Sequence, residues 1–149
     1  MRSTPSFLLL LLAGLSCVSC KSTRDPRESW TAGEGYKYLI VARRFALGGV
    51  GVAGQTSTGE FAFQAVLKDR NAAHLFKAVF LQGTEEGKLY ALCGVRVKDR
   101  SAFDGYASPV VSTNAEVTTQ SGCTVRHEKA TDVVKRIREG FYDWHIANP

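Results

Sequence analysis

The sequence contains no run of five like charges, and it has no apolar stretch of the about 20 residues that a membrane-spanning helix needs. It also lacks the Gly-x-Ser-x-Gly motif of serine hydrolases and the His-Glu-x-x-His motif of zinc peptidases. The first absence argues against a nucleic-acid-binding protein, because such proteins need a clustered basic face. The other absences leave no residues that the sequence alone identifies as catalytic, metal-binding or cofactor-binding.

The first nineteen residues have the order of a signal peptide. Arg2 supplies a positive charge, residues 7–15 are apolar, and small residues and cysteines follow. Val18-Ser19-Cys20 resembles the end of a bacterial lipobox, in which a small residue precedes the cysteine that receives the lipid. The resemblance covers the leader alone and implies a lipoprotein precursor with Cys20 as the lipid-attachment residue. Cys17 is the alternative attachment residue.

This pattern allows two fates for the exported chain. Lipidation would hold it in the cell envelope, on the periplasmic side or at the outer membrane, through an N-terminal lipid. An ordinary secretory signal cut near Ser19 would release a soluble secreted protein instead. Without the leader, 18 Lys and Arg residues remain against 14 Asp and Glu residues, a net charge of +4. We therefore expect an envelope protein or a wall component as partner, with anionic lipid headgroups and acidic wall polymers as suitable neighbours, and no nucleic acid.

The chain after the leader is long enough for one domain with a modest core. Residues 20–34 are polar and contain glycine, which predicts a flexible tether. We expect a single small globular domain over residues 35–149. An apolar content of 44% is too high for a disordered body.

Apolar spacing predicts a mainly helical α+β fold, in which short antiparallel helices precede a small β-hairpin and a C-terminal helix. Helices are expected over 60–68, 71–82 and 86–98, and Gly83 is expected to end the second of them in a left-handed conformation. Ser57, Asn71 and Thr84 are suitable N-caps for these helices. Two segments, 36–47 and 88–98, fit a helix or a strand, and we favour a helix for the first.

The last third of the sequence changes character at Pro109, which is expected to end a short helix that begins after Asp99. Beyond it, the β-branched runs 110–113, 117–119 and 123–125 are non-helical in type and predict a small hairpin that turns at Ser121-Gly122. A final helix is expected over 131–139, with Gly140 as its stop.

The segment Gly49-Val50-Gly51-Val52-Ala53-Gly54 has the Gly-x-Gly-x-x-Gly spacing of dinucleotide-binding proteins. In those proteins a helix begins directly after the glycines, within a unit of parallel strands. Here Gln55 to Thr58 follow, and no such unit is evident. We therefore expect a glycine turn and no cofactor.

Cys93 and Cys123 are the two cysteines outside the leader region. In an oxidising compartment two such residues are expected to form a disulfide. Buried free thiols, a catalytic thiol, or a metal site at Cys123 and His127 with Cys93 or His145 are the alternatives. His74, His127 and His145 have no neighbour in sequence that would define a catalytic triad.

Tyrosine and tryptophan are favoured at interfaces and at sugar-binding surfaces, and they also occur in cores with wet edges. The residues concerned are Trp30, Tyr36, Tyr38, Tyr90, Tyr106, Tyr142 and Trp144. The sequence predicts a lipid-anchored cell-envelope protein that acts as a non-catalytic binding or structural module. The alternative is an exported thiol (Cys-His) hydrolase or a metal-binding protein.

Overall fold

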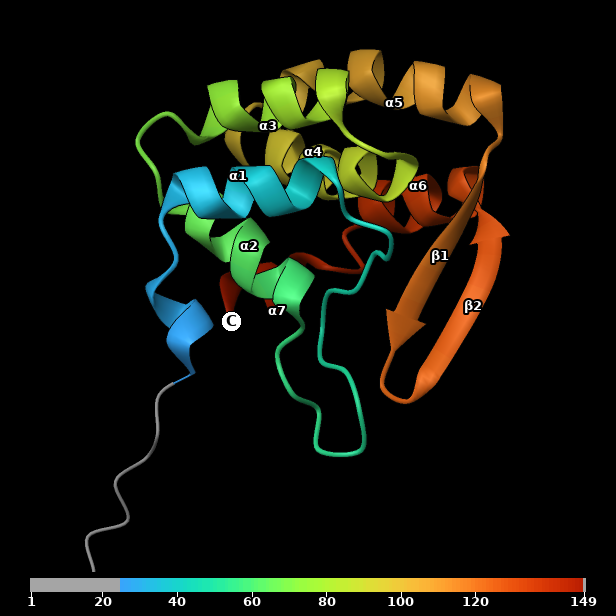
Figure 1. Ribbon diagram of the computed structural model, residues 1–149. Coiled ribbons are helices and arrows are strands. Elements are labelled where there is room, and N and C mark those ends of the chain that lie inside the picture. The colour runs from blue at the N-terminus through green and yellow to red at the C-terminus, as the bar shows by residue number, and fades with distance from the viewer. Residues whose placement is uncertain (1–24, 149) are drawn as a thin grey trace, which may run out of the picture.

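Seven α-helices and one β-hairpin make up residues 25–148, the part of the chain that the computed structural model describes (Figure 1). The predicted mainly helical α+β class is confirmed. The elements are η1 (Pro26–Ser29), α1 (Ala32–Ile40), α2 (Thr58–Leu67), α3 (Ala72–Gln82), α4 (Glu85–Lys98), η2 (Arg100–Ala102), α5 (Phe103–Thr113), β1 (Glu116–Ser121), β2 (Thr124–Lys129), α6 (Ala130–Glu139) and α7 (Asp143–Ala147).

Helix α4 is the centre of the core. Every residue from Leu89 to Val95 is buried, and helices α1, α3, α5 and α6 pack against it. Figure 1 shows α3 and α5 along one side of the domain and the hairpin standing at its edge. A helix buried on all sides has no polar face. For this reason residues 88–98 showed no clear helical pattern in the sequence.

Side-chain caps begin three of the helices. Thr31 and Glu34 form a reciprocal capping box at α1, in which the Thr31 amide donates to the Glu34 carboxylate at 2.7 Å. Ser57 accepts from the Glu60 amide at 2.9 Å at α2, and Thr84 accepts from the Gly87 amide at 3.1 Å at α4. The predicted caps at Ser57 and Thr84 are therefore confirmed. Asn71 occupies the N-cap position of α3 but makes no side-chain cap bond.

The domain begins earlier in the sequence than residue 35. Segment η1 and the first turn of α1 lie within residues 20–34, which the sequence analysis assigned to a tether. Helix α1 then ends at Ile40, so the helix favoured for 36–47 is wrong in its second half. Phe45 is 1% exposed, its amide donates to the Thr118 carbonyl, and its carbonyl accepts from the Gln120 amide. Pairing with β1 and burial of Phe45 therefore outweigh the local helical pattern.

Two further expectations are corrected. Pro109 lies inside α5, so residues 110–113 are helical although they are β-branched. Phe103, Ala107 and Val110 are buried on one face of α5, and this burial outweighs the strand preference of residues 110–113. Gly83 ends α3 in an extended conformation with φ −83°, not in the expected left-handed one. A Cβ there would lie 2.6 Å from the Val79 carbonyl oxygen, so the position requires glycine for space and not for a positive φ.

The hairpin and the helix expected over 131–139 agree with the sequence, whereas α7 was not predicted. Strands β1 and β2 pair antiparallel from Glu116 opposite Lys129 to Ser121 opposite Thr124, and Gly122 has a positive φ of 53° in the turn. Gly140, with φ 84°, ends α6. Within the described range of 25–148, no helix has both the length and the apolar character needed to cross a membrane.

The glycine motif forms a tight turn beside this hairpin. Val50 and Gln55 bond to each other through both backbone groups, at 2.7 and 2.8 Å. The Gly51 amide donates to the Gly122 carbonyl at 2.9 Å, so the glycine turn and the hairpin turn are joined. Helix α2 begins at Thr58, four residues after Gly54, and not directly after the glycines.

Candidate functional site

The two cysteines of the described region are free and occupy different environments. Cys93 lies on α4, 1% exposed in the core, whereas Cys123 is exposed in the turn between β1 and β2. The disulfide predicted from the sequence is therefore not formed in the structure. A disulfide brings its Cβ atoms within about 4.5 Å of each other, and here one side chain is enclosed in the core while the other lies at an exposed turn. Cys20 and its alternative Cys17 lie outside the described residues.

The geometry does not favour the thiol-hydrolase or metal-binding alternatives. Burial raises the pKa of the Cys93 thiol well above its ordinary value, which keeps the thiol protonated and unreactive at neutral pH. His127 Nδ1, on β2, lies 3.3 Å from Thr118 Oγ1. Among residues 25–148 no group of three His, Cys, Asp or Glu side chains is placed to hold a metal ion.

A different site forms around the hydroxyl of Tyr90, a residue of α4 that is completely buried. The Ala46 amide donates to this hydroxyl at 2.8 Å. The hydroxyl also lies 3.3 Å from the carbonyl oxygens of Arg44 and Ala46, to which it can donate. Burial raises the pKa of Tyr90, so the hydroxyl keeps its proton at neutral pH. Tyr90 therefore fixes residues 44–46 against the core.

The start of α2 is fixed to the same segment. Ser57 Oγ donates to the Ala46 carbonyl at 2.7 Å while it caps the helix. Gly59, in the first turn of α2, leaves the space that the Tyr90 hydroxyl occupies, since a Cβ at this position would lie 2.0 Å from it. The segment after α1 and the beginning of α2 thus form one rigid wall.

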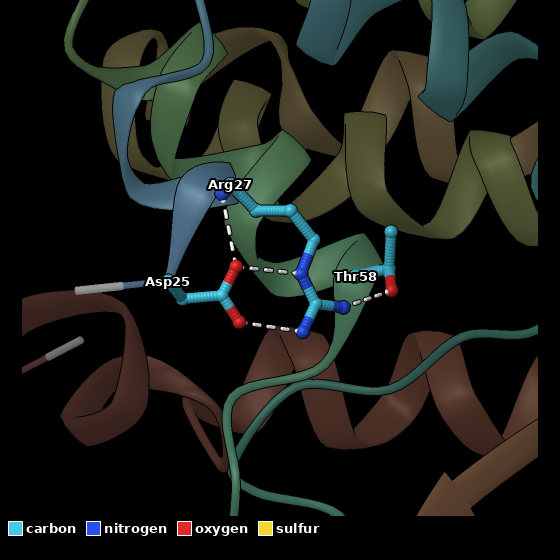
Figure 2. Close-up of polar contacts among 3 residues, drawn as sticks. All are labelled: Asp25, Arg27 and Thr58. Atoms are coloured by element: carbon cyan, nitrogen blue, oxygen red, sulfur yellow. Dashed lines mark hydrogen bonds and ion pairs between the residues drawn. The ribbon is translucent and has the colours of Figure 1, made fainter. Parts of the chain in front are cut away.

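Arg27, in η1, joins the N-terminal segment to this wall (Figure 2). Its Nε and Nη2 donate to the two carboxylate oxygens of Asp25, at 2.9 and 2.6 Å, and its Nη1 donates to Thr58 Oγ1 at 2.7 Å. The guanidinium also lies over the Phe61 ring, 5.0 Å from its centroid. The hydrogen bonds from Arg27 lower the pKa of Asp25 to about 2. The Asp25 carboxylate therefore balances the charge of Arg27 at neutral pH.

Two further arginines, Arg43 and Arg44, follow α1 and carry charge that no carboxylate of the described residues balances. Arg44 Nη1 donates to the neutral Gln120 side chain at 2.7 Å. Neither Arg43 nor Arg44 forms an ion pair with a carboxylate among the described residues. Both side chains are largely exposed, so they are available to an anion from solvent.

These residues line a cleft of about 360 Å³ between η1, the segment after α1, the glycine turn and the start of α2, which we name the arginine cleft. Its lining consists of three arginines, the hydroxyl residues of the wall, and neutral neighbours: Arg27, Tyr38, Arg43, Arg44, Ala46, Val50, Gln55, Thr56, Ser57, Thr58, Gly59, Tyr90 and Gln120. This lining, taken from the described residues, includes no Asp or Glu. The hydroxyls of Ser57 and Tyr90 are used within the wall, so the donors that face a ligand are the guanidinium groups with Thr56 and Thr58 beside them, a set that suits phosphate or carboxylate.

Two other clefts differ in charge. One of about 410 Å³ lies between the hairpin and the C-terminal segment, where Arg136 is paired with Glu128 at 2.8 Å, and His145 lies at its edge. The other, of about 620 Å³, lies between η1 and α2 and includes Trp30 and Phe61. We name the latter the tryptophan cleft. Among the three, the arginine cleft has the largest excess of positive charge.

The sequence analysis did not identify the arginine cleft. Its signals were the adjacent pair Arg43 and Arg44, in a segment interpreted as helix, and Arg27, in a segment interpreted as tether. Arg27 contacts Thr58, and the Arg44 carbonyl lies beside the Tyr90 hydroxyl. No spacing pattern in the sequence connects these pairs. No family model, curated protein or solved structure matches this chain.

Proposed function

We propose that the chain is an exported, lipid-anchored protein of the cell envelope whose domain is a non-catalytic module that binds a phosphate-type anion in the arginine cleft. The leader with its lipobox-like Val18-Ser19-Cys20 supports export and anchoring. The observation that carries the binding function is the pair Arg43 and Arg44, which lies without a carboxylate partner in a cleft that has no acidic lining among the described residues. Anionic headgroups and acidic wall polymers supply such groups in an envelope.

The rigidity of the wall supports a binding function. Tyr90 and Ser57 hold the backbone of residues 44–46 by buried hydrogen bonds, so the guanidinium groups extend from a fixed support. A fixed backbone leaves only the side-chain freedom of the two arginines to be lost when a ligand binds.

The binding function is tested by calorimetric titration of the purified protein with inorganic phosphate. We expect the R43Q/R44Q variant to lose at least about tenfold in affinity, since hydrogen bonds to charged groups contribute about 1.5–3 kcal/mol each. The control is K98Q/R100Q, which removes the same charge from two exposed residues at the end of α4 and in η2. Equal losses of phosphate affinity in the two variants would show that net charge alone determines binding, which would contradict the proposed site.

The anchor is tested on the protein purified from its native envelope, by intact mass. We expect a chain that starts at Cys20 and carries added acyl mass. A mature chain that begins near the same position but carries no acyl mass would contradict the lipid anchor and indicate a secreted protein.

A further inference from the structure

The tryptophan cleft adjoins the arginine cleft. Arg27 and Thr56 line both of them. Tyr38, in the arginine cleft, packs against Trp30 of the tryptophan cleft with ring centroids 5.8 Å apart. Arg27 and Thr56 therefore stand at the border that the two clefts share.

The aromatic residues of the tryptophan cleft are half-buried and held in place. Trp30 packs against the core and against Tyr38, and Phe61 lies under the Arg27 guanidinium. Such rings offer a flat apolar surface at low entropic cost, because they are already ordered before a ligand arrives.

Polar groups accompany these rings. Gln64 is 7% exposed and its amide nitrogen donates to the Ile146 carbonyl at 3.2 Å, so the amide is fixed. Lys68, the C-cap residue of α2, is exposed and also lines the cleft. An ordered aromatic surface beside an amide and an ammonium group suits a ring with one apolar face and several hydroxyls.

We propose that the two clefts form one extended site for a phosphorylated sugar, with the phosphate in the arginine cleft and the sugar ring against Trp30 in the tryptophan cleft. This inference rests on the proposed binding of an anion and names the class of ligand to which the anionic group belongs. A bare phosphate would leave the tryptophan cleft, the largest of the three described clefts, unused.

The experiment uses the fact that the sequence contains two tryptophans. In the W144F variant, Trp30 is the sole source of tryptophan fluorescence. We titrate this variant with inorganic phosphate, glucose 1-phosphate and glucose, and we measure affinity in parallel by calorimetry. We expect glucose 1-phosphate to bind about tenfold more tightly than phosphate, equivalent to about 1.4 kcal/mol, and to change the Trp30 emission. Phosphate alone should leave the emission nearly unchanged.

Two variants locate the gain in affinity. W30A should reduce the affinity for glucose 1-phosphate to that for phosphate and leave phosphate binding intact. K68Q, which changes another residue of the same cleft and keeps the Trp30 ring, should reduce the difference in affinity between the two ligands. F141A is the matched control, because Phe141 is an exposed aromatic residue outside both clefts. Circular dichroism verifies that each variant is folded.

The outcomes separate the two proposals. Equal affinity for phosphate and glucose 1-phosphate, with unchanged emission, would overturn the sugar site and leave the anion site standing. Failure of both ligands to bind would remove the anion site and the sugar site together. Tighter binding to phosphatidylglycerol vesicles than to glucose 1-phosphate would overturn the sugar site in favour of a lipid headgroup without a ring.

Discussion

Gly59 and Tyr90 are complementary in shape: the hydroxyl of Tyr90 occupies the space that a side chain at Gly59 would fill. A Cβ at Gly59 would lie 2.0 Å from the hydroxyl oxygen and 2.6 Å from Cζ of the ring. Since Tyr90 is completely buried, the ring has no free space into which it can move. The wall of the arginine cleft therefore depends on the absence of one methyl group.

This contact predicts that G59A destabilises the fold by about 1–3 kcal/mol or more, the usual cost of overpacking a core. The control is G105A in α5, where a new Cβ would meet no atom within 4 Å. That variant should be neutral or should stabilise the fold by about 0.5–1 kcal/mol, because alanine restricts the unfolded chain. Urea unfolding measures both values, and a G59A variant as stable as G105A would contradict the packing described.

The Tyr90 hydroxyl is also predicted to stabilise the fold through its hydrogen bonds. Y90F leaves the buried Ala46 amide without its acceptor, which costs about 1–3 kcal/mol. The control is Y36F, because the Tyr36 hydroxyl bonds to the exposed side chain of Gln82, where water can replace it. Its loss should cost less than about 0.5 kcal/mol. Similar unfolding free energies for the two variants would argue against a role of Tyr90 in holding residues 44–46.

The ion pair of Asp25 with Arg27 predicts an altered titration of Asp25. Its pKa is about 2 because Arg27 donates to the charged form. The pair therefore stabilises the fold above about pH 4, and this contribution is lost as the pH falls toward about 2. The R27Q substitution should return the pKa of Asp25 to its ordinary range, and carbon-detected NMR titration measures this pKa. The R138Q variant, which removes a pair with Asp104 instead, should leave Asp25 unchanged, and a shift there would show that the effect is not local.

The different environments of the cysteines predict selective modification. Iodoacetamide should alkylate Cys123 in the native protein, since the residue is exposed. Cys93 should react only after unfolding, because it is buried and its pKa is raised by that burial. Peptide mapping by mass spectrometry identifies the modified residues. Native alkylation of Cys93 at a rate similar to that of Cys123 would contradict the buried position of the thiol.

Much of the fold was predictable because its signals are local. Ser57 and Thr84 cap helices in the positions that their types favour, and Gly140 ends α6 in the left-handed conformation that glycine adopts readily. The hairpin followed from β-branched runs on either side of Gly122. Pro109 was misleading because contacts from elsewhere in the chain bury the helix that contains it.

The arginine cleft was not predictable because its parts come from segments with unrelated local patterns. Arg27 follows a proline in a polar stretch, Arg43 and Arg44 lie within a stretch with a helical pattern, and Thr58 lies beyond the glycine turn. Their meeting depends on a buried hydroxyl of α4 and on pairing with β1. Neither contact produces a periodic pattern in the sequence.

The pairing of Phe45 with β1, and of the glycine turn with the hairpin turn, determines when this site can exist. Arg44 and its partner Gln120 are 76 residues apart, and closing a chain segment of this length is slow compared with the formation of a helix. During folding, helices α1 to α4 can form from local contacts before β1 pairs with Phe45, whereas the arginine cleft cannot. The arginine cleft is thus among the last features to assemble, and a ligand of the proposed site would bind completed domains and not partly folded chains.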